Sequence, residues 1–128
     1  MSIKKINLLF KISRPDHFIK HLFIIPGIFF AVLLAPNNQL NLFNCFLGFM
    51  SSFLIASGNY AMNEYLDKDY DKYHPKKKFR SLVNINFIKS DILLYCLSLY
   101  LISLIISLYI NIYFFYTSLA FIISALMY

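Results

Sequence analysis

Apolar and polar residues follow one another along this chain in long blocks. Three mainly apolar runs carry no charge: residues 21–35, 42–62 and 92–128. The last run has 37 residues, about twice the ~20 that an apolar helix needs to cross a bilayer, and Asn111 near its middle is the expected turn. The pattern therefore predicts an all-α integral membrane protein with four transmembrane helices, near residues 18–36, 42–62, 91–110 and 112–128.

The composition agrees with a protein whose surface faces lipid. Hydrophobic residues make up 59% of the chain and charged residues 14%, with a mean hydropathy of +0.62, whereas soluble domains carry roughly 25% charged residues. The net charge of +6 is confined to segments that flank the apolar runs. This location favours a bilayer surface or a phosphorylated substrate over nucleic acid. Cys45 and Cys96 lie inside apolar runs and suggest neither a disulfide framework nor a metal site.

The basic residues also predict the orientation of the chain. All Lys and Arg residues fall within residues 1–20 and 63–91. With four spans both segments lie on one side of the membrane, and the positive-inside rule makes that side cytoplasmic. We therefore expect a single multi-pass domain over residues 1–128, in a bacterial-type inner or plasma membrane. Its N-terminus and a motif loop over residues 63–90 would be cytoplasmic.

Carboxylates at helical spacing follow the second apolar run. Asn63, Asp67 and Asp71 stand at i, i+4 and i+8, so a continuing helix would stack them on one face. Two exposed like charges at this spacing repel, whereas Mg²⁺ would join them, because it prefers carboxylate oxygens, water and substrate phosphate. Asp69 points off this face and is expected to be a solvated partner of Lys72 or Lys68. The alternative interpretation is an acidic helix end balanced by neighbouring lysines.

A basic run comes directly after the carboxylates. His74-Pro75 is expected to end the helix, because the residue before proline avoids helical geometry. Lys77 and Arg80 then offer a mobile charge and a planar fork for phosphate oxygens. Attraction to anionic lipid is the alternative role for such a run.

A second basic cluster precedes the first apolar run. Arg14, His17 and Lys20 recur every three residues and would share one face of a helix. Ser13 with Pro15 is expected to begin that helix, since proline is tolerated in a first turn. Interfacial anchoring is the alternative interpretation of this cluster.

Together these motifs resemble the UbiA superfamily of intramembrane prenyltransferases. The resemblance rests on Arg14-Pro15-x-His17-Phe18-x-Lys20 and on Asn63-Glu64-x-x-Asp67-x-x-x-Asp71. It implies the first half of a larger helical bundle with a cavity facing the cytoplasm. It also implies that Mg²⁺ on a diphosphate is held by Asn63, Asp67 and Asp71, and that phosphate is bound by Arg14, Lys20, Lys77 and Arg80. The resemblance names no catalytic residue.

The tail His74-Pro75-x-Lys77-x-x-Arg80 is most similar to the decaprenyl-phosphate phosphoribosyltransferase branch of that superfamily. This similarity implies transfer of phosphoribose from phosphoribosyl pyrophosphate to a polyprenyl phosphate lipid. The chain departs from the family pattern in four places, which are Phe18, His21, Glu64 and Ser81, and it has no second aspartate motif. It is therefore expected to be the front part of a longer protein, or to need a second chain that supplies the missing half.

Two other functions remain open at this point. The first is an aromatic-acceptor prenyltransferase that uses a polyprenyl diphosphate donor. The second is a non-catalytic protein, either a truncated membrane remnant or a small subunit that binds lipid phosphates through its basic loop.

Overall fold

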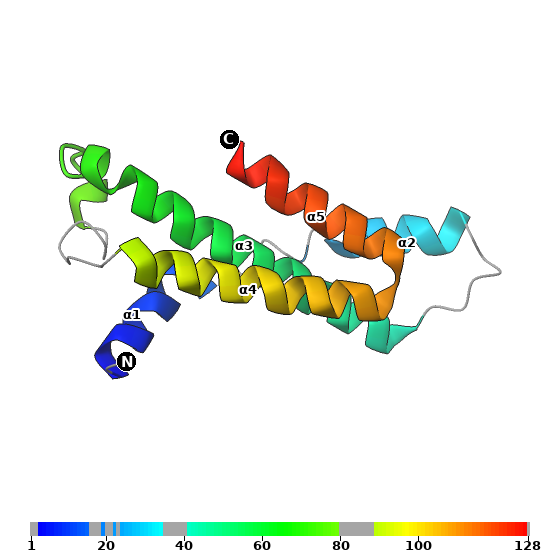
Figure 1. The fold of residues 1–128 in the computed structure, drawn as a ribbon. Coiled ribbons are helices and arrows are strands. Elements are labelled where there is room, and N and C mark those ends of the chain that lie inside the picture. The colour runs from blue at the N-terminus through cyan, green and yellow to red at the C-terminus, as the bar shows by residue number, and fades with distance from the viewer. Residues whose placement is uncertain are drawn as a thin grey trace.

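The computed structural model describes residues 3–15, 19, 22, 24–34, 41–79 and 89–127 of the chain. In this part of the chain the secondary structure is helical, without strands. The elements are α1 (Ile3–Ile12), α2 (Ile24–Leu34), α3 (Leu42–Asp71), the short 3-10 helix η2 (Lys77–Phe79), α4 (Lys89–Ile110) and α5 (Ile112–Leu126). The long helices α3 and α4 lie side by side, and α5 folds back along them (Figure 1).

Among the described helices, α3 and α4 are long and apolar enough to cross a membrane. The helices α2 and α5 have 11 and 15 residues. At about 1.5 Å per residue they extend ~16 Å and ~22 Å, less than the ~30 Å of a hydrocarbon core. The two long helices match the second and third expected spans. Part of the first expected span lies outside the described residues, and α2 and α5 as described are shorter than the hydrocarbon core, so the topology of four spans stays a prediction.

Asparagine side chains mark where two helices begin. Asn41 Oδ1 accepts hydrogen bonds from the backbone N–H groups of Phe43 and Asn44, at 3.0 Å and 3.2 Å. Asn111 does the same for Phe114 N at 2.7 Å and has extended backbone geometry. Each side chain satisfies donors that have no partner within the first helical turn. The break between α4 and α5 therefore falls at Asn111, where the sequence predicts a turn.

A buried ladder of serine hydroxyls joins the three packed helices. Ser51 Oγ on α3 lies 2.7 Å from Ser103 Oγ and 2.9 Å from Ser107 Oγ, both on α4. Ser107 Oγ lies 2.8 Å from Ser118 Oγ on α5. Ser51, Ser103 and Ser107 are fully buried, and Ser118 is nearly so. In lipid, small hydroxyl residues let helices approach closely and hydrogen-bond across the interface, so this ladder helps to set the register of α3, α4 and α5.

Near the middle of α3, a tyrosine ring packs against a glycine. A Cβ added to Gly58 would lie 2.6 Å from Cε1 of Tyr100. The ring is held there because the Tyr100 hydroxyl donates a hydrogen bond to Asn59 Oδ1 at 2.7 Å. Cys96 Sγ also donates to Gly58 O at 3.4 Å. The close approach of α3 and α4 at this level depends on glycine.

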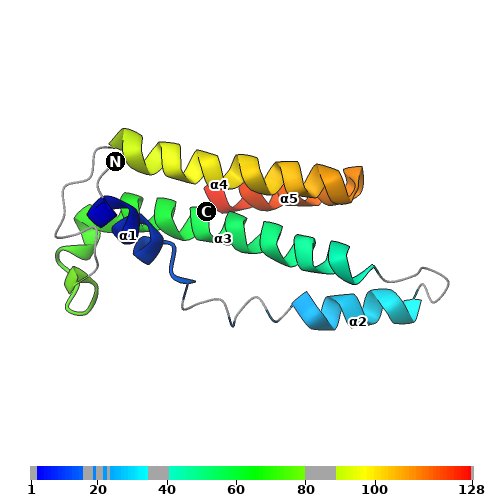
Figure 2. The same cartoon turned by 90° about the horizontal axis from the view of Figure 1, so that it is seen from below.

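An additional helix, α1, covers the end of the bundle where α3 finishes and α4 begins (Figure 2). Its buried side chains, Leu9 and Ile12, join a core cluster with Ile55, Ala61, Ile92, Cys96, Tyr100 and Ile122. At its end, Ser13 Oγ lies 2.7 Å from the hydroxyl of Tyr95 on α4.

The predicted helix start at Ser13 and Pro15 stays a prediction, because residues 16–18 lie outside the described part of the chain. Ser13 lies in the turn after α1, which ends at Ile12, and Pro15 has 3-10 helical geometry. Side-chain packing of Leu9 and Ile12 against the bundle stabilises a helix within residues 1–20, where the charge pattern indicated only a basic flank.

Candidate functional site

Helix α3 continues without a break through the acidic motif. It ends at Asp71, so residues 63–71 belong to the helix rather than to a loop. With about 100° of rotation per residue, Glu64 and Asp71 point in directions about 20° apart. Their exposed fractions are 6% and 3%, whereas Asn63 and Asp67 are exposed. The acidic stripe therefore divides into a buried pair of carboxylates and an exposed pair of oxygen-bearing side chains.

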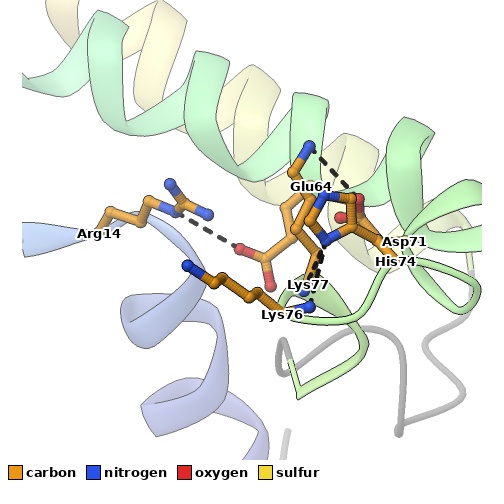
Figure 3. A network of polar contacts seen from close by, with 6 residues as sticks. All are labelled: Arg14, Glu64, Asp71, His74, Lys76 and Lys77. Carbon is orange, nitrogen blue, oxygen red and sulfur yellow. Dashed lines mark hydrogen bonds and ion pairs between the residues drawn. The ribbon is translucent and has the colours of Figure 1, made fainter.

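The first buried carboxylate pairs with a cation from the N-terminal segment. Arg14 Nε lies 3.8 Å from Glu64 Oε2, and the two side chains are 28% and 7% exposed (Figure 3). Arg14 adopts a φ of 50°, the left-handed region that favours glycine. This geometry ends α1 and turns the chain beside α3. Packing of α1 thus brings Arg14, which the sequence predicts to bind phosphate, to the acidic motif of α3.

The second buried carboxylate pairs with a cation from the loop that follows α3. Lys77 Nζ lies 3.6 Å from Asp71 Oδ1, where the Lys77 side chain is 43% exposed and the Asp71 side chain 4%. The loop is held by His74, whose Nδ1 accepts hydrogen bonds from the backbone N–H groups of Lys76 and Lys77, each at 3.2 Å (Figure 3). His74 therefore shapes the turn that returns Lys77 to the end of α3.

A third charge pair at the end of α3 faces solvent. Lys72 Nζ donates to Asp69 Oδ1 at 2.8 Å, and both side chains are largely exposed. The hydrogen bond from Lys72, and then its charge, lower the pKa of Asp69 below its usual 3.8. The prediction that Asp69 is a solvated partner of Lys72 is confirmed.

Among the described residues, no three His, Cys, Asp or Glu side chains gather as a metal site. The oxygens of Asn63 and Asp67 lie one turn apart on α3 and face outward. Mg²⁺ is commonly held by one or two carboxylates together with substrate phosphates and water. Asn63 and Asp67 fit that chemistry, and Asp71 lies one further turn along the helix with Lys77 as its partner.

Of the seven predicted site residues, five fall within the described part of the chain: Arg14, Asn63, Asp67, Asp71 and Lys77. Lys20 and Arg80 lie outside it, as does His17. The structure adds Glu64, which the analysis of the sequence noted only as a neighbour of Asp67. Its i, i+7 relationship to Asp71 is the signal that could have identified it, since such residues share a helix face.

One comparison with known proteins identifies a family. The model of the UbiA prenyltransferase family matches residues 24–128. Neither the curated proteins nor the solved structures contain a match to the chain. The matched region includes the whole acidic motif and the basic loop after it, whereas Arg14 lies before it.

Proposed function

Because this chain belongs to the UbiA prenyltransferase family, we propose that it acts in a membrane-embedded transferase whose substrate is a polyprenyl phosphate or diphosphate lipid. The reaction would take place at the polar end of α3, next to the segments that are apolar enough to cross a membrane. The lipid chain would stay in the bilayer, while its phosphate would reach the charged side chains at the surface.

One observation carries this proposal. The end of α3 places two buried carboxylates on one face, and each lies within 4.0 Å of a cation from a different segment. Burial of a carboxylate is unfavourable unless a partner compensates for lost water. Arg14 and Lys77 provide that compensation and keep 28% and 43% of their side chains exposed. Both cations are thus held in place and remain accessible to phosphate oxygens, which Arg and Lys bind through charge-assisted hydrogen bonds.

Within this class we propose transfer of phosphoribose to a polyprenyl phosphate. An oxygen of the lipid phosphate would form a bond to the anomeric carbon of phosphoribosyl pyrophosphate. The bond from that carbon to pyrophosphate would break, and pyrophosphate would leave with the bonding electrons. The resemblance of the tail His74-Pro75-x-Lys77-x-x-Arg80 to the phosphoribosyltransferase branch supports this choice.

The cationic residues would stabilise the leaving pyrophosphate. Arg14 and Lys77 would bind its oxygens, and Lys20 and Arg80 are proposed to contribute to the same task. Positioned charges of this kind are worth far more in a site that excludes water than in water itself. A Mg²⁺ ion held by Asn63, Asp67 and Asp71 would add positive charge on the diphosphate.

The family assignment also favours a second candidate, which is prenyl transfer to an aromatic acceptor. In that reaction a polyprenyl diphosphate is the donor, and the same cations bind its diphosphate. The two candidates differ in which substrate carries the diphosphate and in which group is transferred.

Two labelled substrates distinguish the candidates in membranes that contain the full chain. One reaction receives phosphoribosyl pyrophosphate labelled in the ribose, with polyprenyl phosphate. The other receives a polyprenyl diphosphate labelled in the lipid, with an aromatic acid. We expect ribose label to enter the lipid phase, and to stop doing so in Asp67→Asn and Asp71→Asn but not in Asp69→Asn. Label on the aromatic acid would establish prenyl transfer instead. No transfer in either reaction would contradict both candidates for this chain by itself.

A further inference from the structure

Glu64 is a buried carboxylate of α3 that pairs with Arg14, just beyond the end of α1. We propose that Glu64 is a positioning residue, which holds the guanidinium of Arg14 at the acidic end of α3 so that α1 delivers a phosphate-binding cation to the site. This inference rests on the function proposed above, and it adds a role for Glu64 that differs from metal binding.

The first support is the contact itself. Arg14 Nε lies 3.8 Å from Glu64 Oε2, and the carboxylate side is far more buried than the guanidinium side. A buried carboxylate holds its partner strongly, because little water competes for it. An arginine has five N–H donors in a planar fork. An ion pair through Nε therefore leaves the terminal N–H groups able to meet a phosphate.

The second support is that contacts of the preceding residues fix the backbone that leads into Arg14. Leu9 and Ile12 are buried in the core of the bundle, and Ser13 joins Tyr95 through their hydroxyls at 2.7 Å. Arg14 N also donates to Lys11 O at 3.2 Å, which closes the last turn of α1. These contacts dock the end of α1 against α3 and α4, and Glu64 then orients the side chain that follows.

The third support is the length of the glutamate side chain. At 3.8 Å between Nε and Oε2, the contact is already long for an ion pair. Aspartate would shorten the side chain by one carbon–carbon bond, about 1.5 Å. An aspartate at this position would therefore lose its hold on Arg14, although it would keep the charge. Glu64→Asp and Glu64→Gln thus test length and charge separately.

The test measures binding of inorganic pyrophosphate to the purified full chain in nanodiscs. We expect Arg14→Ala, Glu64→Gln and Glu64→Asp each to weaken binding by about tenfold, the loss of one charge-assisted contact. The double variant Arg14→Ala/Glu64→Gln should bind no more weakly than Arg14→Ala alone. Asp69→Asn, an exposed carboxylate on the same helix, should bind as the unmodified chain does. Losses that multiply in the double variant, or normal binding by both Glu64 variants, would overturn the proposal.

Chemical rescue separates positioning from a merely structural role. Millimolar guanidinium ion should restore pyrophosphate binding to Arg14→Ala, because Glu64 still holds a guanidinium at that place. It should restore nothing in Arg14→Ala/Glu64→Gln. Equal rescue of both variants would show that Glu64 does not hold the cation.

A measurement without any substrate keeps this inference distinct from the proposed function. The midpoints of thermal unfolding of the two single variants and the double variant report the coupling of Arg14 with Glu64. One result is a chain that binds no pyrophosphate but whose changes in midpoint are non-additive in the double variant. That result would support the ion pair but refute the phosphate site, and with it the positioning role. Additive midpoints would refute the pair itself, whatever the chain binds.

Discussion

Lys77 Nζ lies 3.6 Å from Oδ1 of Asp71, and this contact ties the loop after α3 to the last residue of that helix. Asp71 is 3% exposed, whereas Lys77 keeps 43% of its side chain in contact with solvent. Loss of the Lys77 charge is therefore expected to destabilise the fold, because Asp71, unlike Lys77, lies in a place from which water is excluded.

Lys77→Gln is expected to lower the free energy of unfolding by about 1 kcal/mol, because it removes a cation beside a buried carboxylate. Asp71→Asn/Lys77→Gln should recover part of that loss, since no charge then remains buried at the pair. The midpoints of thermal unfolding in detergent compare these variants. Equal midpoints for Lys77→Gln and the unmodified chain would contradict the prediction.

Gly58 is expected to tolerate no larger side chain. In Gly58→Ala, the new Cβ would lie 2.6 Å from Cε1 of Tyr100, whose hydroxyl is held by Asn59. Crowding of this kind costs about 1–3 kcal/mol. Gly27→Ala is the matched control, because a Cβ there meets nothing within 4 Å. Unfolding midpoints that fall equally in both variants, or in neither, would contradict the prediction.

The serine ladder is expected to contribute modestly. Ser103→Ala removes the hydrogen bonds of the Ser103 hydroxyl to the hydroxyl and to the backbone carbonyl of Ser51. The expected loss is about 0.6 kcal/mol, the average for hydrogen bonds between membrane helices. Ser124→Ala serves as the control, because its hydroxyl is exposed and bonds only to a carbonyl of its own helix among the bonds described. A larger loss in the control would assign the effect to helix propensity rather than to the ladder.

Asp67 is expected to be the carboxylate on which divalent-metal dependence relies. If the proposed transfer reaction is observed, Asp67→Asn should lower it by about 100-fold and raise the Mg²⁺ concentration needed for half-maximal rate. Asp69→Asn should change neither quantity, because its partner is Lys72. Titration of Mg²⁺ after treatment with a chelator measures both variants. An Asp67→Asn rate equal to that of the unmodified chain would remove Asp67 from the site.

The pair of Asp69 and Lys72 predicts pH effects only at the extremes. The pKa of Asp69 is lowered from 3.8, first by the hydrogen bond from Lys72 and then by its charge. Its contribution to stability is therefore complete above its ordinary pKa and is lost as the pH falls through the lower folded pKa. The pKa of Lys72 is raised from 10.5, so its contribution is lost as the pH rises above that value. Between about pH 5 and 9, Asp69→Asn should not change how the unfolding midpoint depends on pH.

Sequence alone predicted those features that depend on short stretches of the chain. Blocks of apolar residues predict helices in a membrane. Lipid offers no water to the backbone N–H and C=O groups, and a helix bonds these groups to one another. Asn111 predicts a helix start through its own side chain, and Asp69 finds Lys72 at i, i+3, within one turn. The acidic motif was likewise visible as a helix face. Its continuation in α3 through Asp71 needed only helical residues after Met62 and a stop before Pro75.

The tertiary structure decided which of these residues meet. The sequence indicated only a basic flank over residues 1–20, whereas in the structure Leu9 and Ile12 bury α1 against α3 and α4. That packing brings Arg14 to Glu64, a pairing that no local spacing encodes. Asp71 is buried beside Lys77 from the loop after α3, whereas Asp67 is exposed, a difference that the i, i+4 pattern does not predict. Hydropathy and side-chain type specify what each helix contains, whereas the angles at which the helices pack specify which charges lose contact with water and therefore need a partner.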